Sequence, residues 1–166
     1  NSFRGADFNN AEKVVTDNIA IGDEALNSTG ANGQVGTIAI GSNALTDLTS
    51  GTENTAVGYQ AGWKATTANY NTAVGWKSLG GNQSSALTGS RNTAIGDLAL
   101  MTINDSGTSN TAVGVQALEN LTNGAKNTAL GDVAGDVITT GTGNVYIGWT
   151  ATASANDVTD EILIKA

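Results

Sequence analysis

The segment Asn54-Thr55-Ala56-Val57-Gly58 is one of eight related pentads that divide this 166-residue chain into repeats. The glycines that end the pentads are separated by 19, 17, 17, 21, 18, 17 and 17 residues. They are Gly22, Gly41, Gly58, Gly75, Gly96, Gly114, Gly131 and Gly148. A recurrent period of this size over most of a chain indicates a repeat architecture rather than an ordinary globular domain.

The pentad has the pattern of a short β-strand that ends in a turn. A branched aliphatic residue precedes every pentad glycine, and the residue before it is Ala in every copy except the last, which has Tyr146. Side chains alternate between the two faces of a strand, and glycine reaches backbone angles that other residues resist. We therefore predict an all-β fold, a parallel β-solenoid of about eight coils. Strands about 4.8 Å apart would stack into a rod roughly 40 Å long.

The alternation divides the strand residues into two opposite faces. The aliphatic residue before each glycine shares a face with the Ile, Thr or Val two positions earlier, and the Ala column faces the other way. We expect the aliphatic face to line the interior and the Ala column to lie outside. A coil of this size encloses little apolar volume, so an isolated chain would be short of core. The sequence therefore predicts a homotrimer whose Ala columns meet at a common axis.

An asparagine stands at the start of most pentads. The column comprises Asn18, Asn54, Asn71, Asn92, Asn110, Asn127 and Asn144. We interpret it as a ladder in which each side-chain amide bonds to the next coil and holds the coils in register.

The repeats set the expected organisation of the chain. We assign residues 1–17 to an N-terminal cap or linker, 18–155 to the β-roll repeat domain and 156–166 to a C-terminal capping strand. Ile162 and Ile164 alternate in that last segment and predict a strand that covers an exposed edge. Segments rich in Gly, Ser, Thr and Asn predict loops at Thr29–Gly36, Leu48–Glu53, Gly81–Arg91 and Asn104–Ser109.

Composition restricts the function. The formal net charge is -8, from 15 acidic and 7 basic residues, so we expect no nucleic-acid partner and no binding to anionic membranes. An apolar run long enough for membrane insertion is absent from the sequence, and so is a signal peptide within Asn1–Ala20. The chain has no Cys and no His, which removes thiolate metal ligands and the usual general base.

Carboxylates are the remaining candidates for catalysis. Asp23, Asp97 and Asp132 follow the pentad glycine in coils that are not neighbours, so they are too scattered for an acid/base pair. Asp160 and Glu161 are interpreted as part of a solvated cap. The calcium-binding nonapeptide and the EF-hand loop are also absent from the sequence. We therefore predict no enzymatic activity, no catalytic residues, no metal and no cofactor.

Aromatic and basic residues cluster in the central repeats and form the best candidate for ligand contact. The set is Tyr59, Trp63, Lys64, Tyr70, Trp76 and Lys77. Tyr59 and Trp76 hold the same position in adjacent coils, so the group could form an aromatic strip flanked by cations. Such a strip would suit a sugar face or a peptide. The alternative interpretation is that these rings cover a loop or fill the contact between chains.

The repeat sequences resemble those of known fibrous proteins. Asn54-Thr-Ala-Val-Gly58-Tyr-Gln-Ala-Gly62 and Asn110-Thr-Ala-Val-Gly114-Val-Gln-Ala-Leu118 are similar to the left-handed parallel β-roll repeats of trimeric autotransporter adhesin heads. They resemble even more closely the repeat regions of bacteriophage tail fibres and related virion fibres. The resemblance covers roughly residues 18–152, and the coils are longer than those of adhesin heads. It implies a left-handed coil and a trimer.

These observations lead to one expected function and two alternatives. We expect a structural fibre protein of a bacteriophage particle, a rigid spacer or host-attachment rod located in the virion. Its partners would be its own copies, other virion proteins and a glycan or protein of the host surface. The first alternative is the head of a trimeric adhesin on the bacterial surface or outside the cell. The second is an ice-binding solenoid, which the single Thr column, interrupted by Ile19, Ile38 and Val145, fits less well.

Overall fold

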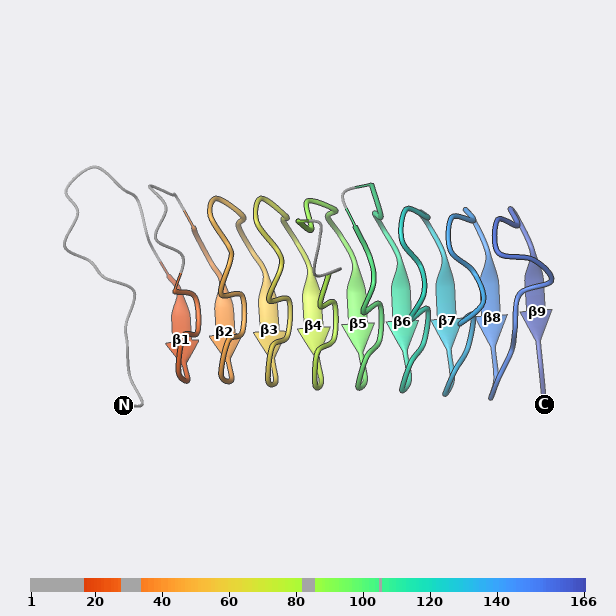
Figure 1. Ribbon diagram of the computed structural model, residues 1–166, viewed down its shortest axis with the longest axis horizontal. Coiled ribbons are helices and arrows are strands. Elements are labelled where there is room, and N and C mark those ends of the chain that lie inside the picture. Colours follow the sequence, from red (N-terminus) through yellow and green to blue (C-terminus); the bar gives the residue numbers. More distant parts are fainter. Residues whose placement is uncertain (1–16, 28–33, 82–85, 105) are drawn as a thin grey trace.

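The computed structural model describes residues 17–27, 34–81, 86–104 and 106–166. Nearly all of the predicted N-terminal cap, and residues 29–33, 82–85 and 105 of the predicted loops, lie outside this part. The described residues form nine parallel strands in one sheet, whose order follows the sequence (Figure 1). The strands are β1 (Ile19–Ile21), β2 (Ile38–Ile40), β3 (Thr55–Val57), β4 (Thr72–Val74), β5 (Thr93–Ile95), β6 (Thr111–Val113), β7 (Thr128–Leu130), β8 (Val145–Ile147) and β9 (Ile162–Ile164).

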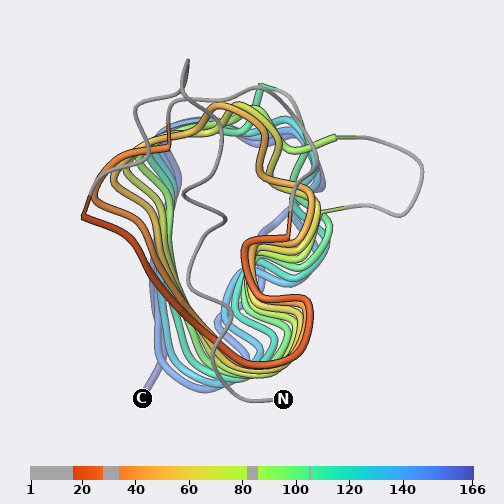
Figure 2. The same ribbon diagram turned by 90° about the vertical axis from the view of Figure 1, so that its left-hand side faces the viewer.

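Successive coils stack in register, which confirms the predicted parallel β-solenoid. Thr55 pairs with Thr72, Ala56 with Ala73 and Val57 with Val74, and the other strands follow the same rule. Figure 2 looks along the rod from its left-hand end in Figure 1. In this view the chain descends along the strands on the left and rises on the right as it recedes. A counterclockwise path away from the viewer is left-handed, as the resemblance implied.

The expectation that the Ala column lies outside is wrong. Ala39, Ala56, Ala94, Ala112 and Ala129 are fully buried inside the coil, whereas the aliphatic residues beside them are partly or largely exposed. The physical reason is space. Leucines and isoleucines from the rest of the coil fill the interior, and they leave room for only a methyl group behind the strand. They include Leu45, Leu48, Leu79, Leu87, Leu100, Ile103, Leu118, Leu121 and Ile138.

The asparagine ladder is confirmed, and its bonds are more numerous than expected. Asn110 donates from Nδ2 to the Gly124 carbonyl at 2.9 Å and to Asn92 Oδ1 at 3.1 Å. Its own Oδ1 accepts hydrogen bonds from the backbone N–H and the Nδ2 of Asn127, at 3.0 and 3.1 Å. Both Asn110 and Asn127 are fully buried. Each amide therefore joins its own coil to the coils on both sides.

The pentad glycines are required by the close approach of successive coils. Their φ angles lie between +116° and +138°. A Cβ atom placed on Gly114 would lie 2.2 Å from the carbonyl oxygen of Gly131 in the next coil. Because this contact is with backbone, no side-chain movement could relieve it.

The last coils depart from the repeat in a compensated way. Tyr146 takes the place of Ala in β8 and is fully buried. A Cβ atom on Gly135 would lie 2.8 Å from Tyr146 Cδ2 and 2.7 Å from Leu118 Cδ2, so the glycine in place of leucine makes room for the ring. The predicted C-terminal strand is present as β9, which pairs in parallel with β8 and continues the same register, Tyr146 opposite Leu163.

Candidate interaction surface

The outward side of the sheet is a long, nearly uncharged surface, which we call the strand face. It consists of two columns, the first and third residues of β1 to β9. The first column is Ile19, Ile38, Thr55, Thr72, Thr93, Thr111, Thr128, Val145 and Ile162. The third-residue column is Ile21, Ile40, Val57, Val74, Ile95, Val113, Leu130, Ile147 and Ile164. No residue of either column carries a charge, and the third-residue column is aliphatic along the whole rod.

One border of the strand face, the upstream edge, lies two residues before each strand. Its members are Asp17, Gly36, Glu53, Tyr70, Arg91, Ser109, Lys126, Gly143 and Asp160. All the non-glycine members have φ between 56° and 62°, the left-handed region, so their side chains turn away from the coil. The edge is held by bonds to the preceding coil, such as Lys126 N–H to the Thr108 carbonyl at 3.0 Å.

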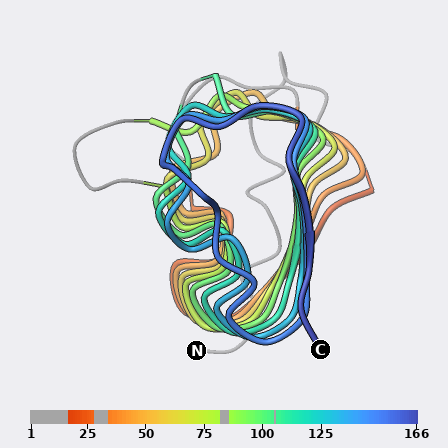
Figure 3. The ribbon, with the colours of Figure 1, turned by 90° about the vertical axis from the view of Figure 1, so that its right-hand side faces the viewer.

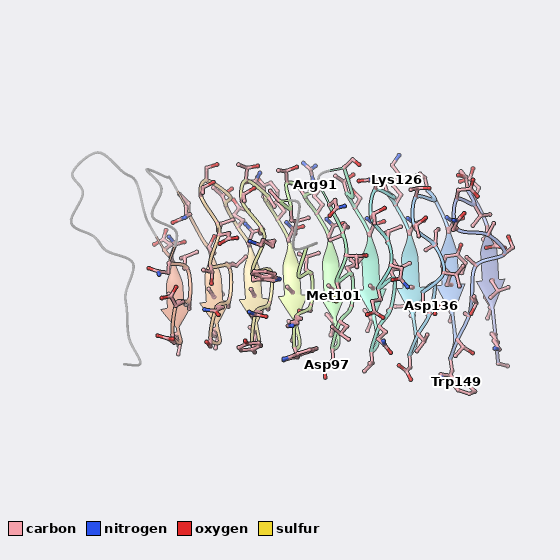
Figure 4. All side chains as sticks on the ribbon, viewed as in Figure 1. Arg91, Asp97, Met101, Lys126, Asp136 and Trp149 are labelled. Atoms are coloured by element: carbon pink, nitrogen blue, oxygen red, sulfur yellow. The ribbon has the colours of Figure 1, made fainter. Side chains whose placement is uncertain are left out.

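The opposite border, the downstream edge, follows the pentad glycines. Its members are Asp23, Ser42, Tyr59, Trp76, Asp97, Val115, Asp132 and Trp149. Their carbonyls accept hydrogen bonds from the next coil, as in Lys77 N–H to the Tyr59 carbonyl at 2.9 Å. Figure 4 shows Arg91 and Lys126 on one side of the row of strands and Asp97 and Trp149 on the other.

The structure does not bring the six predicted contact residues into one strip. Tyr59 and Trp76 are exposed in adjacent coils of the downstream edge, with Lys77 Nζ 4.6 Å from the centre of the Trp76 ring. Tyr70 lies on the upstream edge, where Arg91 stacks over its ring at 5.6 Å.

The remaining two members lie on another part of the coil. Lys64 Nζ is 4.4 Å from the Trp63 ring centre and forms an ion pair with Asp47 at 2.8 Å. The predicted strip therefore divides into three separate aromatic–cation groups.

Sequence reasoning missed the most exposed aromatic residue of the described part of the chain. Trp149 is 70% exposed and lies on the downstream edge in the same position as Tyr59 and Trp76. Lys165 lies 6.0 Å from its ring centre. Arg91 and Lys126 on the upstream edge were missed as well. The signal was present in the repeat alignment, because each of these residues occupies a position that recurs in every coil.

The aspartates considered for catalysis are scattered, as predicted. Asp23, Asp97 and Asp132 lie on the downstream edge in the first, fifth and seventh coils. Asp97 Oδ1 accepts a hydrogen bond from the Trp76 backbone N–H at 3.1 Å, which gives it a local structural role. Among the described residues, no three His, Cys, Asp or Glu side chains are grouped so that they could hold a metal ion.

Glu161 remains partly exposed near the end of the rod, as the expected solvated cap implies, and it also forms specific hydrogen bonds. Its Oε2 accepts a hydrogen bond from the buried Tyr146 hydroxyl at 3.0 Å and one from the Ser154 backbone N–H at 3.2 Å. Hydrogen bonding by Ser154 is the main cause that lowers the pKa of Glu161, and the bond from Tyr146 adds to it. Burial, together with Glu161, raises the pKa of Tyr146. The carboxylate thus ties the segment before β9 to the core.

From the hydrogen bonds of Glu161, we predict that the last coil becomes less stable in acid. A lowered pKa in the fold means that Glu161 stabilises the fold above its ordinary pKa and that this contribution is lost as the pH falls through the lowered value. The protection factors of the amides at Ser154 and in β9, which are exchange rates corrected for the intrinsic rate at each pH, should therefore fall in acid before those in β4 to β6 do. Glu161→Gln should show lower protection factors at neutral pH and lose this pH dependence. An equal loss of protection in all coils would contradict the assignment to Glu161.

Comparison of the chain with protein-family models, with curated proteins and with solved structures found no match. In the part of the chain that the structure describes, there is no helix of the length and apolarity needed to cross a membrane. The fold defines a left-handed parallel β-solenoid rod with one exposed, largely aliphatic face. Figure 3, which views the other end, shows that the coils keep nearly the same outline along the rod.

Proposed function

We propose that this chain is a segment of a homotrimeric fibre of a bacteriophage particle, a rigid rod that acts as a spacer or a host-attachment element. The observation that carries the proposal is the strand face, which runs the full length of the rod without a charged residue and contains one wholly aliphatic column. A soluble protein rarely leaves a continuous apolar surface of this length in water unless a partner covers it. The resemblance of the repeats to those of virion fibres supports the assignment to a fibre.

The dimensions of the strand face suit an interface between copies. Nine strands about 4.8 Å apart and about six residues from edge to edge give a surface of roughly 40 by 20 Å, about 800 Å² per copy. A stable protein interface buries about 800 Å² on each partner. A second copy presents the same spacing over the same length, so it can match the face coil by coil.

The proposed trimer therefore depends on a different surface from the one that the sequence suggested. The Ala column is inside the coil and is unavailable to another chain. The column of aliphatic residues before the glycines takes its place as the apolar contact. The rigidity of the rod comes from the buried asparagine ladder, which links each coil to the next within a single chain.

A single charge on the strand face should disrupt the oligomer. Ile95, at the end of β5, is 40% exposed, so Ile95→Glu should leave the coil intact but place a carboxylate in the contact. Burial of an unpaired charge is costly, and we expect the trimer to dissociate at micromolar concentration. Light scattering after size-exclusion chromatography would measure the mass.

The chain offers a matched control for this substitution. Val137 is 41% exposed but lies between β7 and β8, away from the strand face. Val137→Glu should leave the trimer unchanged. An unaltered chain that is monomeric at every concentration would contradict the proposed trimer, and equal effects of the two substitutions would contradict the assignment to this face.

The head of a bacterial surface adhesin uses the same kind of rod and the same oligomer. The two functions differ in the position of the rod, on a virus particle or on a cell. Electron microscopy with antibodies against the rod separates them, because the label falls on tails of particles in the first case and on the bacterial surface in the second.

One structural observation gives the ice-binding alternative more support than it had from the sequence alone. The Thr column of β3 to β7 faces outward rather than inward, and its members are aligned in register on neighbouring strands. Binding to ice requires this face to be free, whereas a trimer covers it. A thermal-hysteresis measurement on the purified chain, together with its mass, distinguishes a free ice-binding monomer from a buried interface.

A further inference from the structure

The two edges of the strand face carry opposite charges at matching levels of the rod. Arg91 lies on the upstream edge of the coil of β5, and Asp97 lies on its downstream edge. Lys126 and Asp132 hold the same two positions in the coil of β7. Arg91 and Lys126 are the basic members of the upstream edge as the structure describes it, and each has an acidic residue at its own level.

These charges cannot pair within one chain. Six residues of extended backbone separate the two members of each pair, a distance of about 20 Å. All four side chains are exposed. The ion pair found among the described residues is Lys64 with Asp47, on another part of the coil. Arg91 stacks on Tyr70 and Asp97 accepts a hydrogen bond from the Trp76 backbone N–H, but none of the four charges forms an ion pair within the described part of the chain. Each is therefore available for an ion pair with a neighbouring molecule.

We propose that, in the oligomer, the upstream edge of each chain packs against the downstream edge of the next chain at the same coil level. Arg91 then lies beside Asp97 of the neighbouring copy, and Lys126 beside its Asp132. This inference rests on the proposed homotrimer and specifies how its chains meet. Parallel rods around a common axis must be level, because a stepwise offset would build an open helix instead of a closed ring.

The dimensions of the face agree with this arrangement. If three strand faces, each about 20 Å wide, form the sides of a triangular prism, each face lies roughly 6 Å from the central axis. Two packed sheets are about 10 Å apart, so each lies about 5 Å from the plane midway between them, a similar distance. The aliphatic and threonine columns then fill the axis, and the two edges meet at the three corners.

The other levels show what the corners would contain. The coil of β4 places Tyr70 opposite Trp76 of the neighbour, which makes an aromatic contact, and the coil of β6 places Ser109 opposite Val115. The first coil places Asp17 opposite Asp23, so we expect no attraction there. The complementary charges thus lie in the coils of β5 and β7, the fifth and seventh of the nine strands.

Exchange of the charges tests the pairing. Arg91→Asp or Asp97→Arg alone places like charges at each of the three corners, and each should raise the concentration at half dissociation by on the order of tenfold at low salt. The double variant Arg91→Asp/Asp97→Arg should restore association to within about threefold of the unaltered chain. Circular dichroism would verify that each variant keeps the β-fold.

Engineered disulfides test the level directly, because the chain has no cysteine of its own. Ser109→Cys combined with Val115→Cys should produce, on oxidation, a covalent trimer in denaturing electrophoresis, whereas either cysteine alone should not. As a control, Ser109→Cys with Trp149→Cys places the thiols two coils apart, about 10 Å along the rod. This exceeds the usual Cα separation of about 4.4 to 6.8 Å in disulfides.

The outcomes separate the two proposals. If the single charge substitutions leave trimer association unchanged and no crosslink forms between positions 109 and 115, the edge pairing is wrong, but the fibre proposal is unaffected. A chain that is monomeric at all concentrations overturns both. A covalent dimer in place of a trimer supports the edge pairing and contradicts the number of chains.

Discussion

Gly114→Ala is expected to destabilise the rod by about 3 to 5 kcal/mol. Two costs combine. The φ of Gly114 is +138°, a conformation that side-chain-bearing residues rarely adopt, and the new Cβ would lie 2.2 Å from the Gly131 carbonyl oxygen and 2.5 Å from its carbon. The coils would have to separate at this point. Urea unfolding of the variant and of the unaltered chain measures the difference.

Gly36→Ala is the matched control for this prediction. Gly36 also has a positive φ, +63°, but a Cβ there would meet only the Glu53 side chain, at 3.5 Å, an ordinary contact. We expect a cost of about 1 kcal/mol, from the left-handed backbone alone. Similar losses in the two variants would show that backbone conformation, and not the spacing between coils, accounts for the glycine at the end of every pentad.

Asn110→Asp should destabilise the rod by about 3 kcal/mol or more at neutral pH, although the two side chains have nearly the same shape. Asn110 is fully buried, and its Nδ2 donates to two oxygens, those of Gly124 and Asn92. A carboxylate in its place would turn a negative oxygen toward both acceptors. Two hydrogen bonds become repulsive contacts, and a charge is buried without a partner.

The pH dependence of this variant follows from the same contacts. Burial among acceptors favours the neutral acid, so the pKa of the new carboxyl should be raised in the fold. A raised pKa means that stability is retained below the ordinary pKa of aspartic acid and is lost as the pH rises. Asn110→Asp should therefore approach the unaltered chain in acid and fall behind it toward neutral pH.

An exposed asparagine provides the comparison. Asn123 accepts a hydrogen bond from the Ser106 hydroxyl at 3.1 Å through Oδ1, an atom that aspartate keeps. Asn123→Asp should change the stability by less than about 0.5 kcal/mol at any pH. If Asn110→Asp were equally mild, the ladder would contribute little to stability, and the rigidity of the rod would have to come from the apolar interior.

The candidate surface was predicted less well than the fold. Tyr59 and Trp76 were placed correctly in adjacent coils, because both follow a pentad glycine directly. Trp63 and Lys64 were assigned to the same group on nearness in sequence alone. One repeat makes a complete turn around the rod. Residues that are only a few positions apart in the sequence can therefore lie on different sides of the rod. Position within the repeat, and not separation along the chain, decides which residues share an edge.

The repeat by itself determined the parallel solenoid, the number of coils and the asparagine ladder, because these depend on a period and on residue types that recur at one position. Only the tertiary structure decided which of the two strand faces points into the coil and which points outward. Alternation states that the Ala and aliphatic columns are opposite, but it contains no information about the volume on each side. Leu45, Leu100 and Leu118 share the buried core with the Ala column and occupy much of that volume. A larger residue, Tyr146, is accommodated in this column where Gly135 stands in place of a leucine. The aliphatic column consequently faces outward, where another chain can cover it.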